Sequence, residues 1–324
     1  MKLSKLITSV ISLLIIACIV AGCGATTTQK TTASAELKEL RFGIVPLPHY
    51  AHMWVAYKKG FVDEELKKVG YKVKWQPFNI GVMVNEAFTS NQLDMGIMGD
   101  FPVFIGRSSG TNYRIVSIAS SGPKTLAMVT KKDSPIKSVE ELKGKKIATT
   151  KASYGQKLLI ALLEKNKMSV EDIQFVHMTM DDLTAALVRG DVDAGVMWDP
   201  LITRMEDAGE IKIIADGTGI YEAYAVLMAS GDMVGKNPQV VDAMLKAFQR
   251  GRDYLQQSPE ECVKILGEDI KIPPAQMTKI VAKFNYDDKI TDKFIVDMKD
   301  TEAFMRKNGL IKNPVDVDAL VRRN

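Results

Sequence analysis

A short motif occurs twice in this chain, and no other feature constrains the fold as strongly. The first copy is Leu93–Pro102 (LDMGIMGDFP), and the second, 99 positions later, is Val192–Pro200 (VDAGVMWDP). Each copy follows a stretch of helical periodicity and contains a short apolar strand that ends in an aspartate near a proline. Ligands of open α/β sheets bind outside the carboxyl ends of the strands. Two equivalent strand ends therefore predict two lobes that face one cleft, which is the architecture of a binding protein.

The first 22 residues are typical of an export signal. Two lysines precede an apolar run over residues 6–20, which is too short for a membrane span and ends in small residues. The residues before Cys23 resemble the lipobox of bacterial lipoproteins, in which the cysteine carries the lipid. We therefore expect Cys23 to anchor the protein to the extracytoplasmic face of the cell membrane. We expect residues 23–36 to form a flexible tether, because positions 24–35 contain no large apolar side chain.

Charge and cysteine content argue against several classes of protein. Removal of the signal lowers the formal net charge from +4 to +2, and no block of five or more Lys or Arg residues occurs. Nucleic-acid-binding domains have a stronger basic footprint, so we expect no nucleic-acid partner. Cys18 leaves with the signal and Cys23 would carry lipid, which leaves Cys262 without an intramolecular disulfide partner. The chain has no coiled-coil heptads, so we expect a monomer that is stabilised by its core alone.

Strand-like and helix-like stretches alternate up to residue 230, which predicts an α/β fold with largely parallel sheets. The pattern then becomes almost wholly helical over residues 238–323. A polar segment at residues 131–135 and a return crossing near residues 222–226 divide the chain into two lobes. We expect lobe I to comprise residues 37–130 and 226–324, and lobe II residues 131–225. The predicted strands are Leu40–Val45, Val73–Pro77, Met95–Met98, Ile115–Ala119, Ala127–Thr130, Lys146–Thr149, Ile173–Met178, Gly195–Met197, Lys212–Ala215 and Ala223–Met228, and the predicted helices before the tail are Met53–Lys59, Val62–Val69, Val84–Ser90, Ser153–Lys165, Leu183–Arg189 and Leu201–Asp207.

Several spaced motifs resemble the solute-binding proteins of bacterial ABC importers, in the group for aliphatic sulfonates, taurine and nitrate. The resemblance implies a type II periplasmic-binding fold, with two lobes around a cleft and a helical C-terminal part. It also implies that the lobes close on a small anionic or zwitterionic solute and deliver it to a permease and ATPase complex. The same scaffold serves thiamine-type pyrimidines, so the solute stays open. The matching segments are Ala56–Phe61, Gly99–Pro102, Ser138–Ala148, Gly190–Ala194 and Trp198–Pro200.

The sharpest ligand-binding candidates are Ser153, Tyr154 and Gly155, at the start of a predicted helix that follows a strand. A helix N-terminus offers free backbone N–H groups and a partial positive charge to a sulfonate, nitrate or carboxylate. Gly155 allows close approach of the backbone to a ligand. The structural alternative is that Ser153 only caps its own helix.

The ends of the duplicated strands supply a second group of candidates, namely Gly99, Asp100 and Phe101 in the first copy and Trp198 and Asp199 in the second. Aspartate near proline is also a good helix start, so each aspartate either caps a helix or accepts a hydrogen bond from a ligand amine or hydroxyl. Two carboxylates in the cleft would disfavour a bare inorganic anion and favour a zwitterion. Trp198 faces either the core or the cleft.

Three further segments end predicted strands or lie at the return crossing. A stiff loop with two prolines follows the first strand, and a Ser-Ser-Gly segment ends another. At the crossing, the resemblance implies a hinge strand beside the ligand. A plain turn and a solvated hinge are the structural alternatives. The candidates in these segments are Pro48, His49, Tyr50, Ser121, Glu222 and Tyr224.

The sequence predicts neither a metal site nor a cofactor. His49 and His52 form a pair, but no third ligand cluster accompanies them. Gly-x-Ser-x-Gly, His-Glu-x-x-His and phosphate-loop motifs do not occur in the sequence. We therefore expect capture of a solute without catalysis. An exported enzyme on the same scaffold is the alternative.

Overall fold

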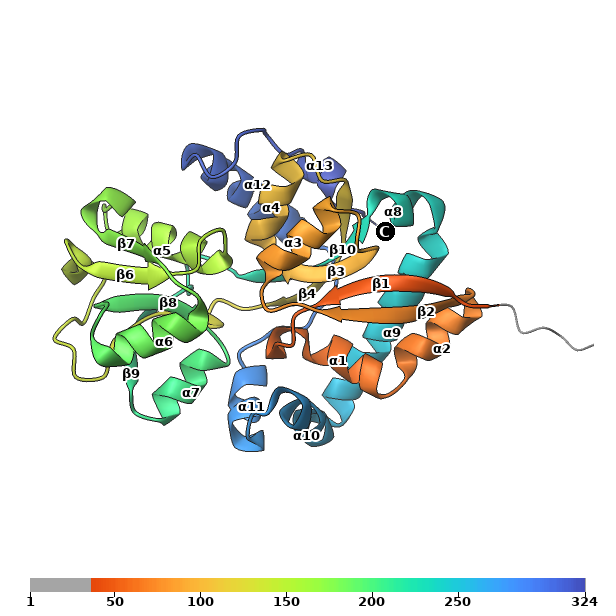
Figure 1. Ribbon diagram of the computed structural model, residues 1–324, viewed down its shortest axis with the longest axis horizontal. Helices are drawn as coiled ribbons and strands as arrows, with labels where there is room; N and C mark the ends of the chain where they lie inside the picture. The colour runs from red at the N-terminus through yellow and green to blue at the C-terminus, as the bar shows by residue number, and fades with distance from the viewer. Residues whose placement is uncertain (1–35, 324) are drawn as a thin grey trace, which may run out of the picture. The chain divides into compact units, whose positions relative to one another are not determined.

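The computed structural model describes residues 36–323, and the chain from Leu37 onward forms one compact unit. This unit contains two five-stranded sheets, called here the first and the second sheet, each flanked by helices (Figure 1). The expected export signal, Cys23 and residues 23–35 of the tether lie outside the described residues. No helix within residues 36–323 combines the length and the apolar character needed to span a membrane.

The first sheet has the strand order β2-β1-β3-β10-β4, and the second has the order β7-β6-β8-β5-β9. In the first sheet β1 pairs in parallel with β2 and β3, whereas β10 runs antiparallel to β3 and β4. The second sheet repeats this pattern, with β6 parallel to β7 and β8, and β5 antiparallel to β8 and β9. The strands are β1 (Lys38–Ile44), β2 (Tyr71–Pro77), β3 (Met95–Gly99), β4 (Tyr113–Ser121), β5 (Leu126–Lys131), β6 (Lys146–Thr149), β7 (Gln174–His177), β8 (Ala194–Trp198), β9 (Ile211–Asp216) and β10 (Tyr224–Ser230).

Each predicted strand has a counterpart in the structure. The sheets are largely parallel, as expected, except that each contains one reversed strand, β10 in the first sheet and β5 in the second. One strand differs from the expected arrangement: β5 was expected in the first lobe, yet it pairs with β8 and β9 of the second sheet. The chain therefore passes between the sheets at residues 122–125 and returns at residues 217–223.

The duplicated motif forms β3 and β8, which occupy the central position of their respective sheets. The two copies have the same register: Phe42 of β1 pairs with Met95, and Ile147 of β6 pairs with Ala194. The glycine that follows each paired residue lets a helix pack closely on the strand. A Cβ on Gly195 would lie 2.8 Å from the side chain of Leu183 in the helix that precedes β8.

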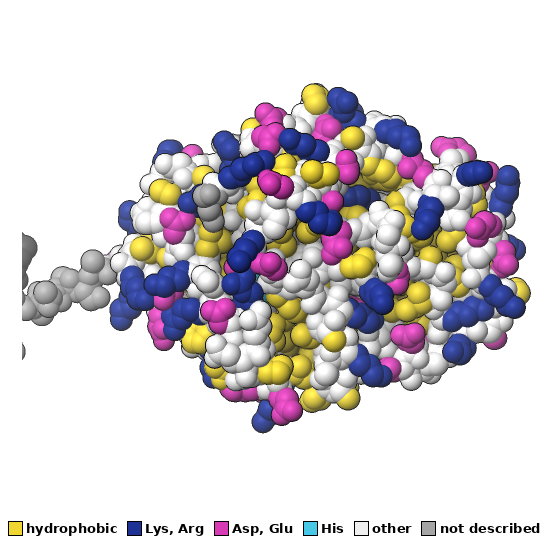
Figure 2. Space-filling view, turned by 180° about the vertical axis from the view of Figure 1, so that it is seen from behind, with side chains coloured by type: hydrophobic (Ala, Val, Ile, Leu, Met, Phe, Trp, Pro, Cys, Tyr) yellow, Lys and Arg dark blue, Asp and Glu magenta, His cyan; other side chains and the backbone are white. Residues whose placement is uncertain are grey.

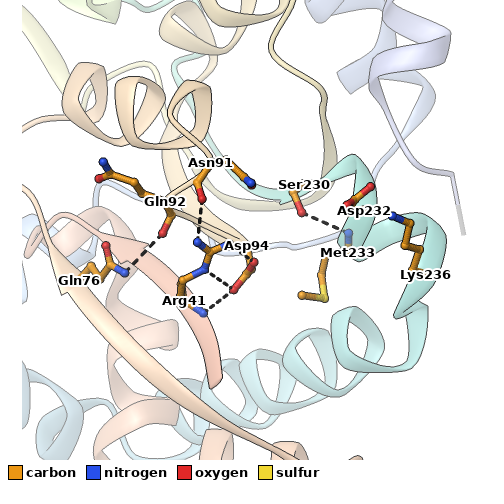
Figure 3. Close-up of polar contacts among 9 residues, drawn as sticks. All are labelled: Arg41, Gln76, Asn91, Gln92, Asp94, Ser230, Asp232, Met233 and Lys236. Atoms are coloured by element: carbon orange, nitrogen blue, oxygen red, sulfur yellow. Dashed lines mark hydrogen bonds and ion pairs between the residues drawn. The ribbon is translucent and has the colours of Figure 1, made fainter. Parts of the chain in front are cut away.

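The first aspartate of each copy, directly before β3 or β8, is bonded to the neighbouring parallel strand. The Asp94 carboxylate accepts the backbone N–H of Arg41 at 2.8 Å, while the Asp94 N–H donates to the Arg41 carbonyl at 2.9 Å. Asp193 makes the same two bonds with Lys146, at 2.8 and 2.9 Å. The Arg41 guanidinium adds a side-chain ion pair to Asp94, at 2.7 Å (Figure 3). Both interactions lie at the amino ends of the parallel strands, opposite the ends where ligands bind.

The helices connect the strands and continue as a helical tail, as the sequence predicts. Three tail helices, α9, α10 and α11, begin with proline in the first turn, where the missing N–H costs no hydrogen bond. Helix α4 follows the first copy of the motif and was not predicted. The helices are α1 (Ala51–Lys58), α2 (Phe61–Lys68), α3 (Gly81–Thr89), α4 (Asp100–Ser108), α5 (Tyr154–Lys165), α6 (Met180–Arg189), α7 (Leu201–Asp207), α8 (Gly231–Lys236), α9 (Pro238–Gln257), α10 (Pro259–Ile270), α11 (Pro274–Val281), α12 (Asp292–Lys307) and α13 (Val317–Leu320), with 3-10 turns at Pro48–Tyr50, Glu140–Leu142 and Val170–Asp172.

Candidate functional site

A cavity of about 380 Å³ lies between the carboxyl ends of the parallel strands of the two sheets. Both sheets contribute to its walls, as two equivalent strand ends predict. Most lining residues belong either to the loop after β1 or to the first turns of helices. They are Val45, Leu47, Tyr50, Asn79, Ile80, Gly81, Val82, Gly99, Pro102, Thr150, Ala152, Ser153, Tyr154, Met180, Asp181, Trp198, Pro200 and Leu201.

Five helices direct their N-termini at this cavity. They follow β2, β3, β6, β7 and β8, and each contributes lining residues from its cap or its first turn. The first backbone N–H groups of a helix have no partner inside the helix, and the helix dipole places partial positive charge there. The cavity therefore offers a set of backbone donors and a positive potential, which suit a small anionic group.

The start of α3 leaves its backbone especially accessible. Its cap residue, Ile80, makes no side-chain hydrogen bond to the first turn. Gly81 packs so closely on β3 that an added Cβ would lie 3.1 Å from the Cβ of Met98. Gly81 and Val82 line the cavity, and no side chain of the cap residue competes for the N–H groups of this first turn.

At the start of α5, the Ser153 hydroxyl accepts the Gln156 N–H at 3.4 Å and donates to the Thr150 carbonyl at 2.7 Å. This side chain is thus engaged within its own turn, while the Ser153 and Tyr154 positions line the cavity. Gly155 lies behind the wall instead. An added Cβ there would be 2.7 Å from Thr149 Oγ1 and 3.3 Å from the ring of Trp198.

Aromatic rings form much of the apolar wall. Tyr154 and Trp198 meet edge to face, with ring centroids 5.0 Å apart, and Tyr50 lies nearby on the lining. Trp198 is 7% exposed, so its ring contacts both the core and the cavity. Gly99 gives Tyr154 the space it occupies, since a Cβ on Gly99 would lie 2.3 Å from the Tyr154 ring. An organic ligand body would pack against these rings.

Charged side chains are scarce in the lining. Among the described residues that line the cavity, Asp181 is the only carboxylate, and no lysine or arginine is present. Asp181 lies in the first turn of α6, where a carboxylate is favoured by the helix dipole. An anionic ligand group would therefore be bound by backbone amides rather than by a cationic side chain.

The second aspartate of each motif copy is fully buried outside this lining. Asp100, at the first residue of α4, accepts a hydrogen bond from the Tyr221 hydroxyl and pairs with Lys157 at 3.5 Å. Burial raises the pKa of Asp100 and lowers the pKa of Lys157, while their mutual attraction opposes both shifts. Asp199 accepts the Thr203 N–H at 3.0 Å, which is a capping bond to α7.

The remaining candidates occupy other places around the cavity. Phe101 is fully buried in the core, and Pro48 is buried with its carbonyl accepting the Tyr286 hydroxyl at 2.9 Å. His49 lies one layer behind the lining, next to Tyr154. The other three are near the crossings but not on the lining: Ser121 is buried at the end of β4, Glu222 is half-buried, and Tyr224 donates to Asp297 at 2.5 Å.

The two neighbouring histidines lie in apolar surroundings. His49 stacks near Tyr154 and Phe284, and His52 near Tyr286, and burial lowers the pKa of each imidazole to about 3. Within residues 36–323, no group of three or more His, Cys, Asp or Glu side chains gathers in a way that could hold a metal ion. Basic and acidic side chains are interspersed over the face seen in Figure 2.

Sequence reasoning missed the lining residues from α3 and α6. Helix α3 was predicted to begin at Val84, so its actual first turn, at Gly81, was left out. Helix α6 was predicted to begin at Leu183, which omitted Met180 and Asp181. Both helices follow parallel strands, and the strand-end rule applied to β2 and β7 would have found them.

The comparisons with known proteins agree with this geometry. A family model described as NMT1/THI5 like matches residues 48–262. An aliphatic sulfonates-binding protein from Bacillus subtilis (strain 168) is 26% identical over 307 residues, covering 94% of this chain and 91% of the relative. The alkanesulfonate-binding protein from Xanthomonas axonopodis pv. citri, solved with MOPS, superimposes with a TM-score of 0.81 at 23% identity, covering 90% of this chain and 100% of that one. A desulfurization enzyme shares the fold at a TM-score of 0.67 and 15% identity, covering 89% and 97%.

Proposed function

The chain belongs to the NMT1/THI5-like family, and we propose that it is the extracytoplasmic solute-binding component of an ABC importer. Its ligand is a small anionic or zwitterionic organic solute of the aliphatic sulfonate or taurine class. The relatives named for binding aliphatic sulfonates and taurine support this class. Delivery to a permease and ATPase complex follows from the same relationship.

One observation carries the proposal: five helix N-termini meet an apolar, aromatic wall in one cavity. The backbone amides can donate hydrogen bonds to the oxygens of a sulfonate group, and the aromatic rings can pack against the organic part of the ligand. Inorganic nitrate would use only the donors and leave the apolar wall unmatched. The geometry therefore favours an organic sulfonate over a bare inorganic anion.

Calorimetry tests the ligand class directly. Titration with butanesulfonate, taurine and nitrate should give saturable heat with the organic sulfonates and weaker binding of nitrate. The absence of heat with all three ligands would contradict the proposed class. Trp198 fluorescence, which should respond because the ring lines the cavity, provides a second readout.

A neutral heteroaromatic such as a thiamine-type pyrimidine is the second candidate, supported by the ring wall of Tyr50, Tyr154 and Trp198. Trp198→Ala separates the two candidates. A pyrimidine held by stacking should lose most of its affinity, whereas a sulfonate held by amides should lose less.

We further propose capture without turnover, although a desulfurization enzyme has this fold. Mass spectrometry of each bound compound after prolonged incubation provides the test, because a changed compound would contradict it. The lobes correspond to the two sheets, with crossings at residues 122–125 and 217–223 acting as hinges. A lipid on Cys23 would anchor a monomer to the membrane. Intact-mass analysis of the membrane-extracted protein and sedimentation would check these two points.

A further inference from the structure

Two lysines join the two sheets through the second aspartates of the duplicated motif. Lys157, on α5 beside the second sheet, reaches Asp100 at the end of β3 in the first sheet. Lys283, which follows α11, reaches Asp199 at the end of β8 in the second sheet. We propose that Lys157 and Lys283 are positioning residues that stabilise the shut form, both without ligand and around a bound ligand. The proposal rests on the capture function above and goes beyond it by naming the contacts that set the lifetime of the complex.

The Lys157 ammonium lies in a closed polar site built from several separate segments. Its Nζ is 3.5 Å from Asp100 Oδ2, 2.5 Å from Thr301 Oγ1 and 3.8 Å from the centroid of the Tyr221 ring. Thr301 lies on α12, which packs on α4 of the first-sheet side, and Tyr221 lies in the return crossing. Lys157 is therefore a second-sheet side chain whose polar partners lie outside its own sheet.

Lys283 makes the reciprocal connection. Its Nζ is 2.8 Å from Asp199 Oδ2 and 2.9 Å from Thr203 Oγ1. The preceding helix α11 packs on α10 and on the Pro48–Tyr50 turn, which belong to the first-sheet side, and it also contacts α7. The Asp199 carboxylate is fully buried and the Lys283 side chain is 22% exposed.

These ion pairs can form only while the two sheets are close together. When the halves separate, both carboxylates and both ammonium groups become hydrated. Removal of one lysine leaves a buried, unpaired carboxylate in the shut form, and such a group costs far more there than in an open, hydrated form. The loss of a buried charge partner acts mainly on the dissociation rate, because the encounter with the ligand precedes formation of the pair.

The test uses the full chain with Lys157→Met, Lys283→Gln and the control Arg41→Gln. The Arg41–Asp94 pair, drawn in Figure 3, has a distance of 2.7 Å but lies within the first sheet, and neither residue lines the cavity. Stopped-flow fluorescence with butanesulfonate gives the two rate constants. Small-angle X-ray scattering without ligand gives the radius of gyration. Lys283→Gln is less prone to misfolding than Lys157→Met, because the Lys283 side chain is partly exposed to solvent.

Each lysine variant should release butanesulfonate about tenfold faster or more, with an association rate within about twofold of the wild type. Its radius of gyration should also exceed that of the wild type, while Arg41→Gln matches the wild type in both measurements. Dissociation rates and radii equal to those of the wild type would overturn the role of the lysines. If the wild type fails to bind butanesulfonate, the proposed ligand class is wrong, and the scattering comparison alone then decides the role of the lysines.

Discussion

Gly99→Ala should impair ligand capture by a steric effect that can be worked out from the structure. The added Cβ would lie 2.3 Å from Cδ1 and 2.9 Å from Cε1 of Tyr154, whereas carbon atoms pack at about 3.5–4.0 Å. The ring has little room to retreat, because Trp198 meets its edge at 5.0 Å and His49 stacks beside it at 6.0 Å. Gly99 ends a strand of the first sheet and Tyr154 begins a helix of the second, so the clash arises where the halves meet.

Overpacking of this kind costs about 1–3 kcal/mol, which corresponds to affinity weaker by about 5- to 150-fold. Isothermal titration with butanesulfonate measures this loss, and thermal unfolding monitors the fold in parallel. Gly235→Ala is the matched control, since nothing lies within 4 Å of its added Cβ. The double variant Gly99→Ala/Tyr154→Ala should bind no more weakly than Tyr154→Ala alone. An affinity for Gly99→Ala equal to that of the wild type would refute the reasoning.

Three further predictions concern pH, a buried hydroxyl and the charge at the cavity. Burial lowers the pKa of His49 and His52 to about 3. Below pH 6.5 the unfolded chain therefore binds more protons than the folded chain. As the pH falls from 6.5, the free energy of unfolding should decrease by up to about 1.4 kcal/mol per pH unit for each of the two histidines. Urea titrations of His52→Phe should show a weaker dependence of the free energy of unfolding on pH. Tyr113→Phe removes the hydroxyl bonded to Val103 O at 2.8 Å and should lower the free energy of unfolding by about 1–2 kcal/mol in the same assay, with binding unchanged. Asp181→Asn should strengthen butanesulfonate binding, because it removes a carboxylate that repels the anion. The gain should be at most about fivefold, since the Asp181 side chain is exposed and its charge is screened by water; weaker binding in calorimetry would contradict this.

Local sequence patterns were sufficient to predict the strands and most helices. Each strand alternates with a helix or a turn of typical composition, and Ser153 caps α5 by accepting the Gln156 N–H. Helix α4 was missed because Pro102 and Gly106 both weaken a helical pattern. The structure resolves this conflict: Pro102 lies in the first turn, where it is tolerated, and Gly106 leaves space for Asn85 and Tyr113.

Features that depend on distant parts of the chain could not be read from the sequence. The pairing of β5 with β8 and β9 follows from sheet register, which local composition does not encode. The aspartates were expected either to cap helices or to touch ligand. Asp199 does bond to the first turn of α7, but each aspartate also has a charged partner from far away: Lys157 is 57 positions from Asp100, and Lys283 is 84 positions from Asp199. No pattern around the aspartates indicates such pairs.

The use of helix starts instead of charged side chains at the cavity has a consequence for how specificity changes during evolution. Backbone amides belong to every residue except proline, so most substitutions at Val82, Ser153 or Tyr154 would keep the donors in place. The wall side chains, such as Trp198 and Leu201, can vary independently. A lineage with this scaffold can therefore change the carbon body that it accepts while the recognition of the anionic head persists as a property of the fold.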